Sequence, residues 1–274
     1  MKNSQIKMVG LEMTKFNQGH KIKWEEPEKL TLEWGDRQAK AIWDEMFSRF
    51  ELEWEGKSVL DFGCMWGYFC RFLLEEQKVR ESVGIDILPK WEDLSDEWNY
   101  QGVENLELFA GDILDIKEIQ GRKFDIITTA GTIFLLSPTY LEGVLNWMYD
   151  HLAPGGSLVL QTRTFFSYNG GDLHNITSIP FPQVIFSRPV IEKFIPGRER
   201  ILNPMSATAF LMLFRRTGFE IINFRKGSGI NEAEHIDMFR QKTWYYTERD
   251  LNTGDIFVHL KKPKLERDLS ELRD

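Results

Sequence analysis

The chain has 274 residues, with 34 Lys and Arg against 42 Asp and Glu, 42% hydrophobic residues and two cysteines. This length suits one large domain with a substantial core. The net charge of −8 disfavours a nucleic-acid partner, because nonspecific affinity for phosphates comes from Lys and Arg. Two cysteines, Cys64 and Cys70, are too few for a disulfide framework or a zinc site, and no metal is expected.

The N-terminus does not resemble a targeting segment. No apolar run reaches the roughly 18 residues of a membrane span, and the first residues lack the apolar centre of a signal peptide. We therefore expect a cytoplasmic protein with no membrane partner.

Residues 1–54 are predicted to form an N-terminal helical cap. A helix is expected from Asp36, whose side chain can cap the first turn. Apolar residues then recur at helical spacing and give this helix one apolar face: Ala39, Ile42, Trp43, Met46, Phe47 and Phe50.

From residue 55 onwards, short apolar runs alternate with helical patterns. Strands are predicted at 58–62, 83–86, 106–110, 124–130, 157–162, 219–224 and 255–260. Helices are predicted from residue 68, from Ser137 as a cap, and from Ser206 as a cap to Gly218. Strands that alternate with helices indicate an α/β fold with a doubly wound, mostly parallel, seven-stranded sheet covered on both faces.

Regular patterning stops between residues 163 and 204, a stretch rich in aromatic residues, prolines and basic residues. Long irregular stretches in compact domains are usually lids or binding segments. We therefore predict a substrate lid at 163–204, inserted into a domain that spans 55–162 and 205–262, with a C-terminal tail at 263–274.

The predicted lid carries the side chains that suit an acceptor. His174 is a candidate general base, because a neutral imidazole can take a proton from an attacking hydroxyl. A surface histidine without a role is the alternative. A local excess of basic residues could bind a phosphate or carboxylate on the acceptor: Arg163, Arg188, Lys193, Arg198 and Arg200.

The most informative segment is VLDFGCMWGYF, residues 59–69. A strand there ends in an acidic residue, and two glycines bracket a tight turn into a helix. In doubly wound sheets, nucleotide-like ligands bind outside the carboxyl ends of the strands. Gly63 would let a ligand approach the backbone closely, and the helix that begins near Gly67 presents unpaired N–H groups.

Two further acidic positions follow the next two strands. The second strand ends in Asp86, which is well placed to accept hydrogen bonds from a ribose diol. The third strand is followed by Gly111-Asp112-Ile113, where a carboxylate can accept from an adenine amino group. The pattern therefore favours a nucleoside-containing ligand at this edge of the sheet.

These motifs resemble those of the class I S-adenosylmethionine-dependent methyltransferases. In that family an acidic-x-Gly-x-Gly-x-Gly motif follows the first strand, an acidic residue ends the second, and an Asp follows the third. The resemblance covers residues 55–162 and, in layout, 206–262. It implies a Rossmann-like fold, S-adenosyl-L-methionine as cofactor and S-adenosyl-L-homocysteine as product.

Motif position implies a role for each matching residue. The methionine end of the cofactor would be lined by the turn after the first strand, namely Asp61, Gly63, Cys64 and Gly67. The ribose would be held by Asp86 and Ile87, and the adenine by Asp112 and the backbone of Ile113. Ala130 and Gly131, after the fourth strand, would border the methionine moiety and face the acceptor.

One position departs from the family motif. Its middle glycine is Met65 here, and a side chain at that position is expected to crowd the turn.

The chain also resembles the wobble-uridine tRNA methyltransferase-like branch of the family. The similarity lies in FDIITTAGTIFLLSP (124–138), NPMSATAFLMLFRRTGFE (203–220) and RQKTWYY (240–246). Enzymes of that branch that use a carboxylated cofactor have a Tyr where this chain has Phe134. We therefore expect ordinary S-adenosylmethionine.

The sequence thus predicts a methyltransferase that acts on a small-molecule acceptor through an oxygen nucleophile. Phe134, Tyr168 and Arg163 are expected to line the substrate pocket. A non-catalytic scaffold subunit with the same fold and an RNA methyltransferase stay open as alternatives. A nicotinamide oxidoreductase is disfavoured, because the chain lacks Gly-x-Gly-x-x-Gly after the first strand. The oligomeric state stays open.

Overall fold

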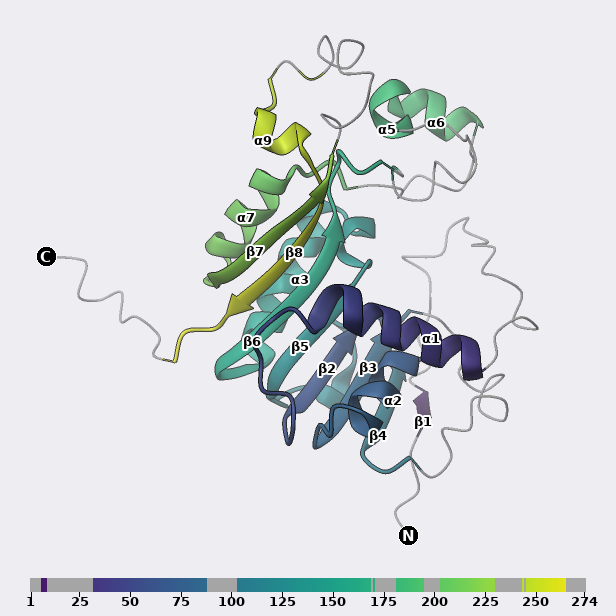
Figure 1. The fold of residues 1–274 in the computed structure, drawn as a ribbon, viewed down its shortest axis with the longest axis vertical. Helices are drawn as coiled ribbons and strands as arrows, with labels where there is room; N and C mark the ends of the chain where they lie inside the picture. The colour runs from purple at the N-terminus through teal and green to yellow at the C-terminus, as the bar shows by residue number, and fades with distance from the viewer. Residues whose placement is uncertain are drawn as a thin grey trace, which may run out of the picture.

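The computed structural model describes residues 6–8, 32–87, 103–168, 170, 181–194, 203–229, 243 and 245–264. Its centre is an eight-stranded sheet in the order β1-β4-β3-β2-β5-β6-β8-β7 (Figure 1). The strands are β1 (Ile6–Met8), β2 (Ser58–Phe62), β3 (Glu81–Asp86), β4 (Leu106–Ala110), β5 (Phe124–Ala130), β6 (Leu152–Arg163), β7 (Glu220–Ser228) and β8 (Thr253–Lys261). β8 runs antiparallel to β6 and β7, and the remaining neighbouring pairs are parallel.

The predicted seven-stranded, mostly parallel sheet is confirmed. The strands expected at 58–62, 106–110 and 124–130 have the bounds that the sequence predicts. The structure adds β1, which pairs with the edge of β4. A three-residue strand contains too few positions to show a period of two, so the sequence pattern did not reveal it.

One face of the sheet is covered by α1 (Leu32–Ile42), the short π-helix η2 (Trp43–Phe47) and α2 (Tyr68–Glu75). The predicted apolar face of the first helix is confirmed, because Ala39, Phe47 and Phe50 are buried. The other three apolar residues of this face are partly buried and pack against the same cluster, which includes Val59, Ile126 and Val159 of the sheet: Ile42, Trp43 and Met46.

The predicted cap at Asp36 is wrong. α1 includes Leu32 to Ile42, so Asp36 lies inside the helix, where its carboxylate pairs with the Arg71 guanidinium of α2. Trp34, before the expected start, packs edge-to-face on Tyr68 with 5.7 Å between ring centroids. A contact between two helices thus extends this helix beyond the start that the local sequence suggested.

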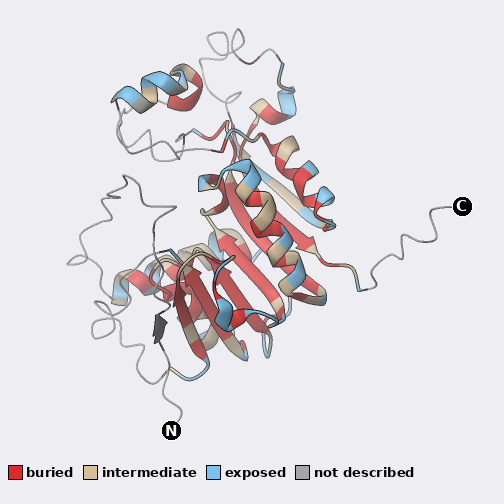
Figure 2. Ribbon diagram, turned by 180° about the vertical axis from the view of Figure 1, so that it is seen from behind, coloured by how far each residue is buried: buried red, intermediate tan, exposed pale blue. Residues whose placement is uncertain are grey.

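The other face is covered by α3 (Pro138–His151) and α7 (Ala207–Arg216). Both predicted caps are confirmed, since Ser137 accepts from the Tyr140 amide and Ser206 from the Ala209 amide, each at 3.3 Å. Neighbouring strand residues face opposite sides of the sheet, so Leu60, Ile127 and Leu158 belong to this second cluster. Figure 2 shows the strands buried between the two helical layers.

A third, smaller cluster lies beyond the carboxyl ends of the parallel strands. It contains Phe166, Phe181 and Val184, with Tyr246 and Leu251 packed against them. The elements here are short helices, α5 (Pro182–Ile185), α6 (Arg188–Phe194) and α9 (Glu248–Leu251), seen at the top of Figure 1. Two 3-10 turns, η4 (Lys117–Ile119) and η5 (Ile133–Leu135), follow β4 and β5.

The predicted lid at 163–204 therefore contains two short helices, and its first residue, Arg163, is the last residue of β6. Its closure over an acceptor stays a prediction. Within the described parts of the chain, no helix combines the length and the apolar character needed to cross a membrane.

Candidate active site at the carboxyl ends of the strands

The acidic residues predicted from the motif come together at one edge of the sheet. In the strand registers, Asp61 of β2 lies opposite Gly84 of β3 and Thr128 of β5, and Asp86 of β3 lies opposite Ala110 of β4. Asp112 is the second residue after the end of β4. Because β2, β3, β4 and β5 are adjacent and parallel, their carboxyl ends form one continuous rim.

Asp61 is the most buried of these carboxylates, with 5% of its surface exposed. The Thr128 hydroxyl donates to Asp61 Oδ1 at 2.7 Å. Burial raises the pKa of Asp61 to about 7, the Asp86 charge acts in the same direction, and the Thr128 bond opposes both. Near neutral pH, a positively charged group placed beside Asp61 would favour its ionised form.

The two motif glycines that flank the turn are required by geometry. Gly63 has φ +77°, and a Cβ there would lie 2.6 Å from Thr132 Cγ2 and closer still to its Oγ1. Gly67 has φ +74°, and a Cβ there would lie 2.8 Å from Leu108 Cδ1. The Gly63 amide donates to the Ile85 carbonyl at 2.8 Å, which fixes the turn to β3.

Met65 takes the backbone conformation that the missing middle glycine would favour. Its φ is +48°, in the left-handed region, where a non-glycine residue is uncommon. The Met65 amide donates to Asp86 Oδ2 at 2.9 Å, and the Tyr68 hydroxyl donates to Met65 Sδ at 3.6 Å. The side chain is thus accommodated by a positive φ and a contact with α2.

Asp112 closes the turn that follows β4. Its Oδ1 accepts from the Leu114 amide at 3.0 Å and from the Tyr140 hydroxyl of α3. The side chain of the neighbouring Ile113 is 1% exposed. Ile113 can therefore meet a ligand only through its backbone, as its predicted role requires.

Cys64 is a packing residue as far as its side chain is concerned. It is 3% exposed, and a Cβ built on Gly84 would lie 2.7 Å from Cys64 Sγ and 2.9 Å from Cys70 Sγ. Burial raises the pKa of the Cys64 thiol, with Cys70 acting in the same direction. Both thiols therefore fill the space against β3, and Cys64 can contact a ligand only through its main chain.

The backbone after β5 is open to an approaching molecule. Gly131 has φ +65°, and its amide donates to the Gln161 carbonyl at 3.1 Å. Among the residues that the structure describes, a Cβ at Gly131 would meet only Gln161 Oε1, at 3.9 Å. Thr132, which follows Gly131, lies against Gly63 of the turn after β2, so this open backbone borders the turn that follows the buried carboxylate of Asp61.

The predicted substrate-pocket residues are only partly brought together. Phe134, in η5, is buried, and the guanidinium carbon of Arg163 lies 5.0 Å from its ring centroid. Tyr168 is 48% exposed and packs edge-to-face on Phe181, in the third cluster. His174 lies outside the described residues, as do Arg198 and Arg200.

Sequence reasoning missed several residues of the site. Thr128 and Thr132 contact Asp61 and Gly63, and Tyr140 contacts Asp112. The sequence could have indicated Thr128 as a site residue, because it stands two residues before Ala130 and so shares its face of the strand. Two others, Gln161 and Asp255, hydrogen-bond to each other across 94 residues of sequence. The only feature of the sequence that could have indicated them is an Asp at the start of an apolar final strand.

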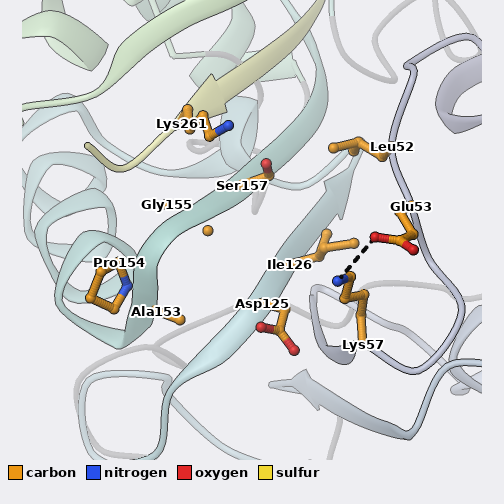
Figure 3. Close-up of a pocket in the computed structure, with 11 residues that line it drawn as sticks. Leu52, Glu53, Lys57, Asp125, Ile126, Ala153, Pro154, Gly155, Ser157 and Lys261 are labelled. Carbon is orange, nitrogen blue, oxygen red and sulfur yellow. Dashed lines mark ion pairs between the residues drawn. The ribbon is translucent and has the colours of Figure 1, made fainter. Parts of the chain in front are cut away.

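A cavity of about 260 Å³ lies at the opposite edge of the sheet (Figure 3). Three of its charged side chains are engaged locally, since Lys57 pairs with Glu53 at 3.3 Å and Asp125 accepts from the Ser58 amide at 2.9 Å. Asp125 is near the start of β5, whereas Ala130 ends the same strand. The cavity is therefore separate from the carboxylate rim.

Among the described residues, no group of three or more His, Cys, Asp or Glu side chains is arranged to hold a metal ion.

The family model described as a methyltransferase domain matches residues 34–223, more than half of the chain. The chain belongs to this methyltransferase family. The match includes the whole turn after β2 and the strand ends that carry Asp86, Asp112 and Gly131. The protein is an S-adenosylmethionine-dependent methyltransferase, which confirms the predicted class of enzyme and its cofactor.

Solved structures share the fold of this methyltransferase. An S-adenosylmethionine-dependent methyltransferase from Mesorhizobium loti matches over 84% of this chain and 98% of its own, with a TM-score of 0.51 and 15% identity. A chain of the Haloferax volcanii complex that contains the Trm112 methyltransferase activator also matches. The match covers 85% of this chain and 97% of that chain, with a TM-score of 0.52 and 17% identity.

The cyclase SpnF also matches, over 88% of this chain and 85% of its own, with a TM-score of 0.52 and 14% identity. At such identities these likenesses show the fold, and the reaction has to be argued from the site itself. No curated protein sequence matches the methyltransferase.

Proposed function

We propose that this methyltransferase moves a methyl group from S-adenosylmethionine to an oxygen of a small-molecule acceptor, at the carboxyl ends of β2 to β6. One observation carries the proposal. Three carboxylates from three neighbouring strands, Asp61, Asp86 and Asp112, share one rim with the open backbone of Gly131.

The proposal gives each part of this rim a ligand group to hold. Asp61 would face the ammonium of the methionine end, where a positive charge would favour the ionised form of a carboxyl whose pKa is raised to about 7. Asp86 would accept from the ribose hydroxyls, and Asp112 from the adenine amino group. The backbone of the remaining predicted residues would complete the contacts: Gly63, Cys64, Gly67, Ile87 and Ile113.

When bound, the cofactor supplies a methyl group on a positively charged sulfur. The task left to the protein is alignment and exclusion of water, and orientation alone can lower a barrier by about 7–11 kcal/mol. Phe134, Arg163 and Tyr168 would line the acceptor side, beyond Ala130 and Gly131. The segment 163–204 would close over the acceptor as a lid.

A calorimetric titration with S-adenosylhomocysteine tests the cofactor site. Wild-type protein should bind, and Asp86→Ala should lose most of the affinity. Asp125→Asn, which changes a carboxylate at the opposite edge, is the matched control and should bind like wild type. A folded wild type that does not bind would contradict the proposal.

A methyl-transfer assay with labelled S-adenosylmethionine separates two other functions. A Met65 side chain that closed the turn to the cofactor would favour the scaffold alternative, but the turn accommodates this residue with a positive φ and a hydrogen bond to Asp86. A protein that binds S-adenosylhomocysteine but transfers no labelled methyl group to small hydroxylated compounds would restore the scaffold hypothesis. Transfer to transfer RNA would favour the wobble-uridine branch.

A further inference from the structure

A second set of polar side chains lies on the same sheet face as Asp61, on β6, which is next to β5, and on β8, which is next to β6. In β6, Val159 belongs to the cluster under α1 and α2, whereas Leu160 belongs to the opposite cluster. Alternation therefore places Gln161 and Arg163 on the face of Val159. In β8, Phe257 packs on that same cluster, so Asp255, two residues earlier, faces the same side.

These side chains contact each other. Gln161 is 7% exposed, and its Nε2 donates to Asp255 Oδ1 at 3.2 Å. Arg163 is the register partner of Asp255 across the antiparallel pair, and its guanidinium stacks over Phe134. Burial raises the pKa of Asp255, while the Arg163 charge and the Gln161 hydrogen bond act against that rise.

The set is linked to the backbone that borders the acceptor. The carbonyl of Gln161 accepts from the Gly131 amide at 3.1 Å, and its side-chain Oε1 is the nearest atom to a Cβ built on Gly131. Asp255 is therefore one side chain away from Gly131.

On the neighbouring strand β7, the residue that lies against Asp255 is a glycine, Gly227. A Cβ at Gly227 would lie 3.1 Å from Asp255 Cβ and 3.5 Å from Oδ2. Any larger residue at 227 would press on this carboxylate. Asp255 itself stays half-buried, so a small ligand can still reach it.

We propose that Asp255 is the general base of the methyl transfer, and that the acceptor presents a neutral hydroxyl to its carboxylate. The inference rests on the proposed function, because it places the acceptor beside Gly131. Gln161 would hold Asp255 in place through Oδ1, and Arg163 would limit the negative charge around the site.

The step balances without another reactant. The acceptor oxygen forms a bond to the methyl carbon while the carbon–sulfur bond breaks, and that electron pair stays on sulfur. The hydroxyl proton passes to the Asp255 carboxylate, which later releases it to water. The positive charge on sulfur and the negative charge on the carboxylate are both neutralised in the step.

A hydroxyl suits this base better than an ammonium group. A protonated amine has no lone pair with which to attack, and a carboxylate is too weak a base to remove its proton beforehand. A hydroxyl attacks while still protonated and becomes strongly acidic as the new carbon–oxygen bond forms. A carboxyl whose pKa is raised can then accept that proton.

Phenol and anisole are a matched pair of probes for this role. They share a ring, but anisole has a methyl ether in place of the hydroxyl and cannot donate a hydrogen bond. The protein, labelled with ¹³C at its aspartate carboxyl carbons and saturated with S-adenosylhomocysteine, is titrated with each probe and followed by NMR. Asp255→Asn assigns the Asp255 signal, and Asp125→Asn assigns a control carboxylate at the opposite edge.

We expect phenol, and not anisole, to move the Asp255 signal, and neither probe to move the Asp125 signal. Asp255→Asn should still bind S-adenosylhomocysteine as the wild type does. If phenol leaves the Asp255 signal unmoved, or if anisole moves it equally, the role of Asp255 is overturned and the proposed function stands. Failure of the wild type to bind S-adenosylhomocysteine would instead defeat the proposed function.

Discussion

The two edges of the sheet, formed by the amino ends and by the carboxyl ends of its parallel strands, differ in how their charges are arranged. At the edge where the chain enters the strands, acidic and basic side chains meet in pairs, such as Lys57 with Glu53. At the edge where the chain leaves them, Asp61 and Asp86 stand on adjacent strands, and the charge of Asp86 raises the cost of ionising Asp61. The cavity of about 260 Å³ lies at the first edge.

This difference shows that a cavity and a binding site need not coincide. Paired charges leave little for a ligand to neutralise. Neighbouring carboxylates with open glycine backbone are costly for the protein alone and become favourable when a complementary ligand binds. We therefore expect substitutions at the carboxyl rim to affect ligand binding, and those at the opposite edge to affect stability alone.

The largest effect is expected from Gly63→Ala, compared with Gly121→Ala. Both glycines have nearly the same φ, +77° and +78°, so each variant should lose about 1–2 kcal/mol of unfolding free energy through backbone strain. Only Gly63 has Thr132 in the way of a Cβ, whereas Gly121 has nothing within 4 Å. Gly63→Ala should therefore lose more stability and also its S-adenosylhomocysteine binding. Equal losses in urea unfolding would contradict the role of Thr132.

The next effect is expected from Asp86→Asn, compared with Asp125→Asn. Asn keeps the size of the side chain but removes its charge, and hydrogen bonds to charged groups contribute about 1.5–3 kcal/mol. The affinity for S-adenosylhomocysteine should fall by about 10- to 100-fold in Asp86→Asn and stay unchanged in Asp125→Asn. Calorimetry measures both, and a similar fall in the two variants would remove the distinction between the edges.

At the opposite edge, His259 should make stability depend on pH. Its ring lies 2.9 Å from Ser157 Oγ and packs on Phe50, and burial lowers its pKa from 6.5 to about 4. The folded state binds fewer protons than the unfolded state in this window, so the unfolding free energy falls as the pH drops from about 6.5 towards 4. We expect a loss of about 2 kcal/mol that His259→Gln lacks. Denaturant unfolding of both proteins at several pH values checks this. If the unfolding free energies of wild type and His259→Gln changed with pH in parallel, the expectation would be refuted.

The smallest effect is expected at Asp61. Because its pKa is raised to about 7, the folded protein without ligand keeps this proton between about pH 3.8 and 7, and the contribution of Asp61 to stability declines as the pH rises through that window. An ammonium group binds the ionised form, so S-adenosylhomocysteine affinity should rise about tenfold from pH 6 to 8. Asp61→Asn should abolish this rise and should be the more stable protein at pH 8. An unchanged slope in the variant would exclude Asp61 as the ammonium partner.

Local sequence was enough to predict much of the fold. Strands such as β2 and β5 contain short apolar runs, Val59-Leu60 and Ile126-Ile127, because both faces of these strands are buried. Ser137 and Ser206 were recognised because a cap acts within three residues of itself. The glycines of the turn, and the Asp that follows each strand, stand at fixed distances along the chain, so the rim could also be predicted.

Contacts between distant segments were beyond such reasoning. Asp36 pairs with Arg71, and Trp34 packs on Tyr68, which places the start of α1 earlier than its local signals do. Thr128 reaches Asp61 across 67 residues. No local pattern specifies such partners, because they depend on which strands become neighbours.

The sequence by itself determined the family, the sheet and the carboxylate rim, since these rest on periodicity and on short spacings around single strands. Only the tertiary structure decided how Met65 fits its turn, through a positive φ and a bond to Asp86 on the next strand. It also decided that Gln161 meets Asp255, because the antiparallel insertion of β8 beside β6 joins residues 94 positions apart. Hydrogen bonds and packing act through space, and a sequence shows only those partners that are also close along the chain.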